Sequence, residues 1–159
     1  MRFLFCLLLL LFGCKSGIDL DELWNDALIF RQNSNLKDSI TCLKKIIEKG
    51  KEKSLLVKAQ YQLADIYLND VNNYTFAVDE FEKLIDNYPD SEFAKKSIFM
   101  LGYINSNYIQ SYDDAIMYYN MFLNKYPDDD LVHSVEYELE LLDSSGIIES
   151  LDRLRVKSK

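Results

Sequence analysis

Residues 73–92 read NYTFAVDEFEKLIDNYPDSE, and residues 111–130 repeat the pattern as SYDDAIMYYNMFLNKYPDDD, 38 residues later. From Ala77 onward, the apolar positions of the first copy fall at i, i+4, i+7, i+8 and i+11, which is the spacing of one helix face. Both copies contain Tyr-Pro-Asp near their end, at residues 88–90 and 126–128. Proline ends a helix because it lacks an N–H and disfavours helical geometry in the residue before it. A repeat of this length predicts a stacked array of helices.

A weaker copy of the same helix precedes the two strong ones. Its apolar residues, in register with those of residues 73–92, are Leu36, Leu43, Ile46 and Ile47. This copy closes at Gly50, where the later copies have Tyr-Pro. A first helix is predicted before each copy. Turn-forming residues end these first helices near residues 33–35, 69–73 and 107–111, because their side chains hydrogen-bond the local backbone.

The C-terminal part departs from the pattern. A further first helix is expected after Asp130, with Tyr137 and Leu139 in register, and residues 144–146 end it. Residues 147–156 are predicted to form a last short helix. An atypical terminal unit is what a helical array needs, because its exposed end face would otherwise be apolar. Basic residues then close the sequence, where they suit a helix C-terminus: Arg153, Arg155, Lys157 and Lys159.

One position of the first helices carries a small residue. Ala64 and Gly102 stand 38 residues apart at this position. A small side chain there allows the two helices of a pair to approach closely. The next residue in the register is Glu140, so we do not expect the same close pairing after the last first helix. Ser111 followed by Asp114 has the spacing of a capping box, with Asp in place of the usual Glu or Gln.

The N-terminus reads as a targeting segment. Arg2 precedes an unbroken apolar run from Phe3 to Phe12, which is about half of the ~20 residues that a transmembrane helix requires. Residues 1–13 are therefore predicted to be a signal peptide. Leu11-Phe12-Gly13-Cys14 resembles the lipobox of bacterial lipoproteins, in which the cysteine is lipidated, although Phe12 departs from the usual small or aliphatic residue. We expect lipidation at Cys14 and a short tether over residues 14–18. The alternative is an ordinary cleaved signal.

The remaining composition excludes several classes of function. A net charge of −8 argues against nucleic-acid binding, because phosphates require basic partners. We find no glycine-rich phosphate loop, no metal-ligand cluster and no nucleophile motif near His133, the only histidine. Asp128-Asp129-Asp130 is interpreted as a solvated turn before a helix N-terminus. Cys42 is interpreted as a small, semi-buried apolar residue on a helix. No catalytic residue, cofactor or metal is therefore expected.

These residues together resemble the tetratricopeptide repeat family. Its signature is a small residue in the first helix, then alanine, an aromatic residue and a terminating proline in the second. One copy here has Ala64, Ala77, Phe81 and Pro89, and the next has Gly102, Ala115, Tyr119 and Pro127. The resemblance implies an all-α, right-handed superhelix of antiparallel helix pairs, with about seven or eight helices. The expected domain spans residues 19–159, with repeats at 19–53, 54–91 and 92–129 and a cap at 130–159.

The Tyr-Pro-Asp ending and the lipobox narrow the resemblance to envelope proteins of Gram-negative bacteria. The sequence resembles the BamD family of outer-membrane assembly lipoproteins, and more weakly the CpoB family of cell-division coordinators. BamD proteins have about five repeats, so contacts made through further repeats do not carry over. The resemblance implies a lipid-anchored adaptor that faces the periplasm from the outer membrane and binds envelope proteins. Two alternatives are a CpoB-like adaptor and an envelope enzyme or ligand receptor with an unrecognised site.

In such repeats the first helices line the concave face of the array. Tyr61, Phe99 and Tyr137 stand at one repeat position, with Tyr103 nearby, and would form an aromatic stripe for an amphipathic helix or an extended peptide. Two readings stay open, because rings in register either bind a partner or pack between repeats. The other candidate residues for partner binding are Lys58, Asp65 and Lys96.

Overall fold

The computed structural model describes residues 19–151. These residues form seven α-helices and one π-helical segment, η1, and the described part of the chain contains no β-strand. The elements in order are α1 (Leu20–Gln32), α2 (Leu36–Lys49), α3 (Lys53–Asn69), α4 (Tyr74–Asn87), α5 (Glu92–Ile104), η1 (Asn105–Ile109), α6 (Tyr112–Lys125) and α7 (Val132–Ser144). Residues 147–151 are again helical.

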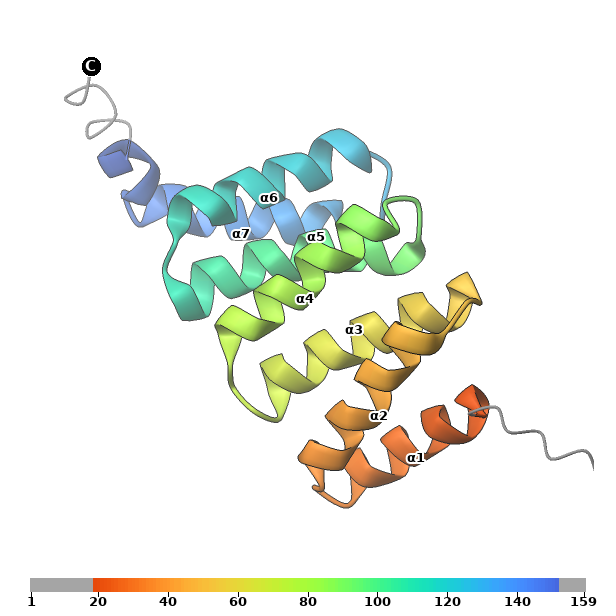
Figure 1. Ribbon diagram of the computed structural model, residues 1–159. Helices are drawn as coiled ribbons and strands as arrows, with labels where there is room; N and C mark the ends of the chain where they lie inside the picture. The colour runs from red at the N-terminus through yellow and green to blue at the C-terminus, as the bar shows by residue number, and fades with distance from the viewer. Residues whose placement is uncertain (1–18, 152–159) are drawn as a thin grey trace, which may run out of the picture.

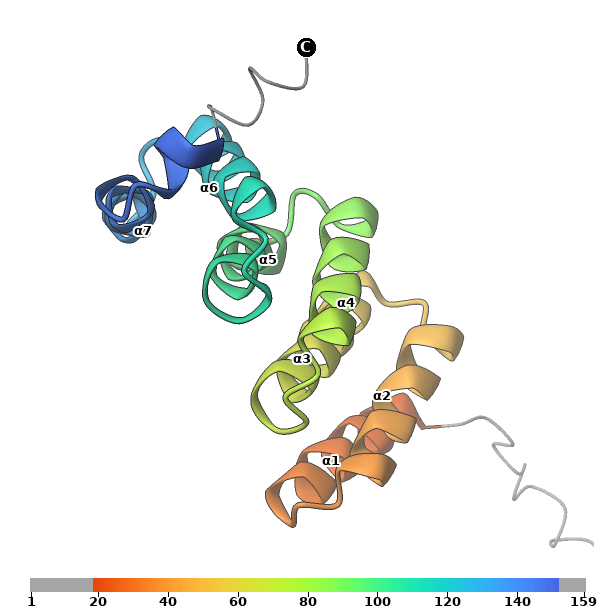
Figure 2. The same cartoon turned by 90° about the vertical axis from the view of Figure 1, so that its left-hand side faces the viewer.

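The helices stack as consecutive antiparallel pairs. α1 packs on α2, α3 on α4 and α5 on α6, while α7 follows as a fourth first helix (Figure 1). Figure 2 shows α2, α4 and α6 along one side of the array and α1, α3, α5 and α7 along the other. The predicted all-α solenoid of helix pairs is confirmed. The signal peptide, Cys14 and the tether up to residue 18 lie outside the described residues, as do residues 152–159.

The Tyr-Pro sequences end their helices as predicted. α4 ends at Asn87 and α6 at Lys125, each directly before the Tyr-Pro pair. The two tyrosines leave helical geometry, with φ of −137° at Tyr88 and −135° at Tyr126. The next helix then begins within a few residues. Ser91 caps α5, because its hydroxyl accepts a hydrogen bond from the N–H of Ala94 at 3.0 Å.

The repeated apolar positions fill the core. Six of them have no exposed surface: Ala77, Phe81, Leu84, Ala115, Tyr119 and Phe122. Tyr119 lies directly on Gly102, since a Cβ added to this glycine would be 2.5 Å from two ring carbons of the tyrosine. The predicted close approach at the small position is therefore confirmed for the pair α5 and α6.

Two local predictions need correction. Ser111 does not cap α6, because its hydroxyl donates to the carboxylate of Asp114 at 2.6 Å and makes no bond to a backbone N–H. The predicted break near residues 107–111 begins as a π-helix that extends α5. Buried Asn105 donates to the carbonyl of Leu101 at 2.8 Å, and the Tyr108 ring stacks on Tyr74 at 4.3 Å. A local hydrogen bond and one tertiary ring contact thus accompany a widened turn that residue spacing does not signal.

Gly102→Ala is expected to destabilise the fold. Overpacking a buried site costs about 1–3 kcal/mol, which exceeds the gain of up to ~1 kcal/mol in helix propensity. Urea denaturation followed by circular dichroism measures the change. Combining Gly102→Ala with Tyr119→Leu gives the control, since removal of the ring makes room for the methyl group. The double variant should lose less stability than the two single losses added together, and an additive result would contradict the contact.

Candidate functional site

All four first helices carry an aromatic residue at the same position. Buried Ala27, Ala64 and Gly102 mark the small position of α1, α3 and α5, and α7 has Glu140 there. Three residues before these positions stand Trp24, Tyr61, Phe99 and Tyr137. Trp24 is the residue of this row that the 38-residue register does not predict. Its signal was Ala27, which the shorter turn between α1 and α2 displaces from the 38-residue register.

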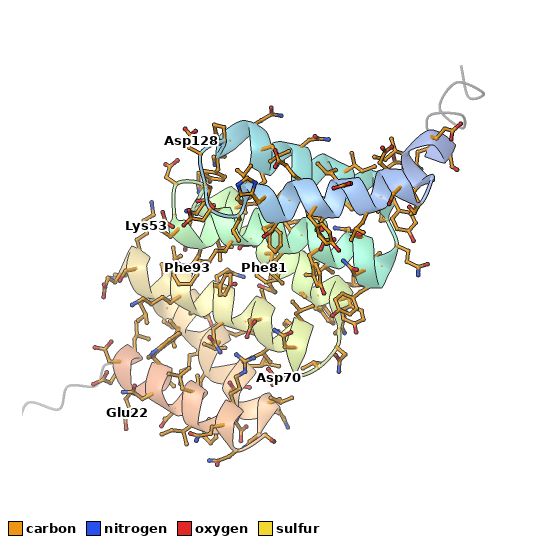
Figure 3. The ribbon with its side chains drawn as sticks, turned by 180° about the vertical axis from the view of Figure 1, so that it is seen from behind. Glu22, Lys53, Asp70, Phe81, Phe93 and Asp128 are labelled. Atoms are coloured by element: carbon orange, nitrogen blue, oxygen red, sulfur yellow. The ribbon has the colours of Figure 1, made fainter. Side chains whose placement is uncertain are left out.

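Tyr61 is half-buried between three helices. Its ring is 5.5 Å from that of Phe81 in α4 and 4.9 Å from that of Phe93 in α5. Figure 3, which views the array from behind, labels both phenylalanines. Tyr61 therefore contacts its own helix pair and the next pair. Burial raises the pKa of its hydroxyl, and the nearby carboxylate of Asp65 adds to the effect.

The other two predicted rings differ from each other. Phe99 is half-buried, with its ring 6.3 Å from Tyr119 of α6 and 6.5 Å from Tyr103. Tyr137 is 59% exposed, whereas its counterparts in α3 and α5 are half-buried. The rings therefore share a register but not an environment. Tyr61 and Phe99 use part of their ring surface for packing against neighbouring helices. The exposed fraction of the side chain is largest at Tyr137.

The three charged residues predicted to bind a partner, Lys58, Asp65 and Lys96, differ in their contacts. Asp65 binds Arg31 of α1 at 2.7 Å and accepts a hydrogen bond from Asn69 at 2.7 Å. Arg31 also binds Asp70 at 2.6 Å, so its guanidinium joins the first helix pair to the second. The Lys96 Nζ lies 5.7 Å from the centre of the Phe93 ring. Lys58 is exposed on α3.

The other residues considered for chemistry, Cys42, Asp129 and His133, are buried or contact neighbouring side chains. Cys42 is 8% exposed, and burial together with nearby Asp26 and Asp38 raises the pKa of its thiol. Asp129 binds Lys95 at 2.6 Å and accepts the N–H of Leu131 at 3.0 Å, which lowers the pKa of its carboxyl. His133 is exposed beside Glu136.

The ionisable residues do not assemble into a cation site in the part of the chain that the structure describes. No group of three or more His, Cys, Asp or Glu side chains there is placed to hold a metal ion. Over residues 19–151, none of the helices has the length and apolar character needed to span a bilayer.

Phe99→Ala and Tyr137→Ala form a matched pair that separates packing from exposure. Removal of the half-buried Phe99 ring is expected to cost about 2–3 kcal/mol, below the ~3–5 kcal/mol of a fully buried ring. Removal of Tyr137 should change the free energy of unfolding by no more than about 0.5 kcal/mol, as is usual for surface residues. Equal losses in urea denaturation would show that the environments described here do not govern stability.

Comparison with protein-family models gives two matches to the tetratricopeptide repeat, at residues 58–91 and 96–129. Each matched segment contains most of a first helix and a complete second helix, α3 with α4 and α5 with α6. No curated protein matches the chain. Tetratricopeptide repeats are in general non-catalytic modules for binding proteins. Two segments of this all-helical solenoid, residues 58–91 and 96–129, therefore match the tetratricopeptide repeat, which suggests a protein-interaction scaffold.

Proposed function

We propose that this chain is a lipid-anchored adaptor of the bacterial envelope, which faces the periplasm from the outer membrane and binds proteins of outer-membrane barrel assembly. The observation that carries the binding role is the aromatic residue at one position of all four first helices. The lipobox-like sequence ending at Cys14 supports the anchor. The resemblance to assembly lipoproteins supports the choice of partner.

The first helices supply apolar anchors beyond the aromatic row. Leu28 is 38% exposed and Leu141 is 46% exposed, and they directly follow Ala27 and Glu140 in their helices. Together with Tyr137 they leave apolar surface available at both ends of the array. An amphipathic helix or an extended segment places apolar side chains at regular intervals and would match this arrangement.

The proposed anchor constrains where the array lies. Five residue steps separate Cys14 from Asp19, and they span at most about 17 Å when fully extended. A lipid on Cys14 would therefore hold α1 close to the membrane surface. α7 lies at the opposite end of the array (Figure 1). The partner would then meet a row of first helices that starts near the membrane and leads away from it.

Capture of a barrel assembly factor from detergent-solubilised envelopes tests the binding role. Leu28→Ala and Tyr137→Ala should each weaken capture, because exposed apolar anchors cost about 2 kcal/mol of binding when truncated, or roughly thirtyfold in Kd. Melting temperature should stay unchanged. Met117→Ala is the matched control, since Met117 is 47% exposed on α6, on the other side of the array. Equal loss of capture in the control, or recovery of no assembly factor, would contradict the proposal.

Cys14→Ser tests the anchor separately. The variant should keep its signal peptide and lack lipid, because serine offers no thiol for acylation. Mass spectrometry of the mature N-terminus measures both properties, and two or more acyl chains are expected on the wild-type chain, since one chain holds a protein only marginally. An unmodified mature N-terminus at another residue would disprove anchoring. It would leave the binding role of the first helices intact.

A further inference from the structure

The helix α7 has unusual side chains at three positions that match those where the preceding first helices contact their paired second helices. In α5 and at the start of η1 these positions are Ile98, Gly102 and Asn105, which are all buried. Gly102 lies beneath Tyr119 of α6. In α3, Gln60 stands in register with Ile98 and hydrogen-bonds Glu80 of the paired helix α4. These contacts identify the face on which a second helix packs.

The corresponding residues of α7 are acidic. They stand 38 residues after the α5 residues: Glu136, Glu140 and Asp143. All three are exposed. Tyr137 borders them. On α5, the Tyr119 ring contacts the equivalent residue Phe99, but among residues 19–151 no ring contacts Tyr137 in this way. We call this surface, Glu136, Tyr137, Glu140 and Asp143, the α7 face.

Charge argues against a second copy of the chain as the occupant. Two α7 faces brought together would oppose three carboxylates with three. The other end of the array, α1, carries Asp21, Glu22 and Asp26 and is also acidic. Like charges facing each other across an interface disfavour association. An occupant that matches the α7 face must carry positive charge and some apolar surface.

Residues 152–159, DRLRVKSK, have this composition. They contain four basic side chains against Asp152, and two apolar ones, Leu154 and Val156. The segment also starts at the correct place. Ile147 and Ile148 pack against the core cluster that includes Leu142 of α7, so the chain leaves the described structure beside the end of α7.

The segment is long enough to cover the face. Eight residues span at most about 28 Å when extended, whereas the 13 residues of α7 measure about 20 Å. We propose that residues 152–159 fold back along the α7 face, with their basic side chains at Glu136, Glu140 and Asp143. Their apolar side chains then contact only the side of the Tyr137 ring that corresponds to the Tyr119 side of Phe99, and the rest of the ring stays available to a partner. The segment then contacts the side of α7 that corresponds to the side of α5 on which α6 packs.

Trypsin cleavage after Arg153 and Arg155 in the full-length chain tests this docking. At low ionic strength, cleavage of the wild-type chain should be about fivefold slower than in the Glu136→Gln/Glu140→Gln variant, because two exposed ion pairs are lost. About 1 M salt should remove the difference, since the Debye length there is only about 3 Å. Asp86→Asn/Asp90→Asn, which removes the same charge from α4 and the turn after it, should cleave like wild type.

Carbodiimide coupling identifies the position of the segment. It forms an amide between a lysine and a contacting carboxylate with loss of one water, and mass spectrometry of the monomer locates the bond. Lys157 and Lys159 are expected to couple to the carboxylates of the α7 face. Coupling mainly to other carboxylates, or only between molecules, would overturn the proposal. Equal cleavage rates in the wild type and the Glu136→Gln/Glu140→Gln variant would overturn it as well.

Discussion

The contact between a small residue of one helix and an aromatic ring of the next is the constraint on which the array depends. Gly102 accepts the Tyr119 ring at a distance that no larger residue permits, and Tyr119 is fully buried there. Ala64 and Phe81 are also fully buried at the equivalent positions of the preceding pair. Close packing of this kind leaves little room to adjust, so the ring sets the separation of the two helices. The position of each first helix relative to its second helix is thereby fixed, and the next pair packs against both.

Successive pairs are joined by apolar contacts, such as that of Tyr61 with Phe93, and also by polar contacts. Arg31 holds Asp65 and Asp70 across the first junction. Tyr118 of α6 donates to Glu82 of α4 at 2.6 Å, and burial together with this carboxylate raises the pKa of the tyrosine. Such contacts are directional, unlike apolar burial. They therefore favour one orientation between pairs, and with it one shape of the surface that the first helices form.

The aromatic position of the first helices serves packing and exposure together. Tyr61 contacts Phe81 and Phe93 while remaining half-exposed, so one ring contributes to the core and to the surface. A ring held by packing loses little entropy when a partner binds, which favours its use as an anchor. Tyr137 lacks the contacts on one side because α7 has no paired helix within the described residues. The end of the array thus has a different surface from its middle.

Residue spacing alone determined the helices, their pairing and the small positions of α3 and α5, because a helix places residues on one face by a fixed period. The ends of α4 and α6 followed from proline chemistry, which is local. Tertiary structure decided what spacing cannot express. The shorter turn between α1 and α2 places Trp24 in the aromatic row, and a π-helix begins at Asn105. Tyr61 is half-buried, whereas Tyr137 is exposed. Burial depends on which helices lie next to a residue, and equivalent positions in a repeat have different neighbours at the middle and at the end of the array.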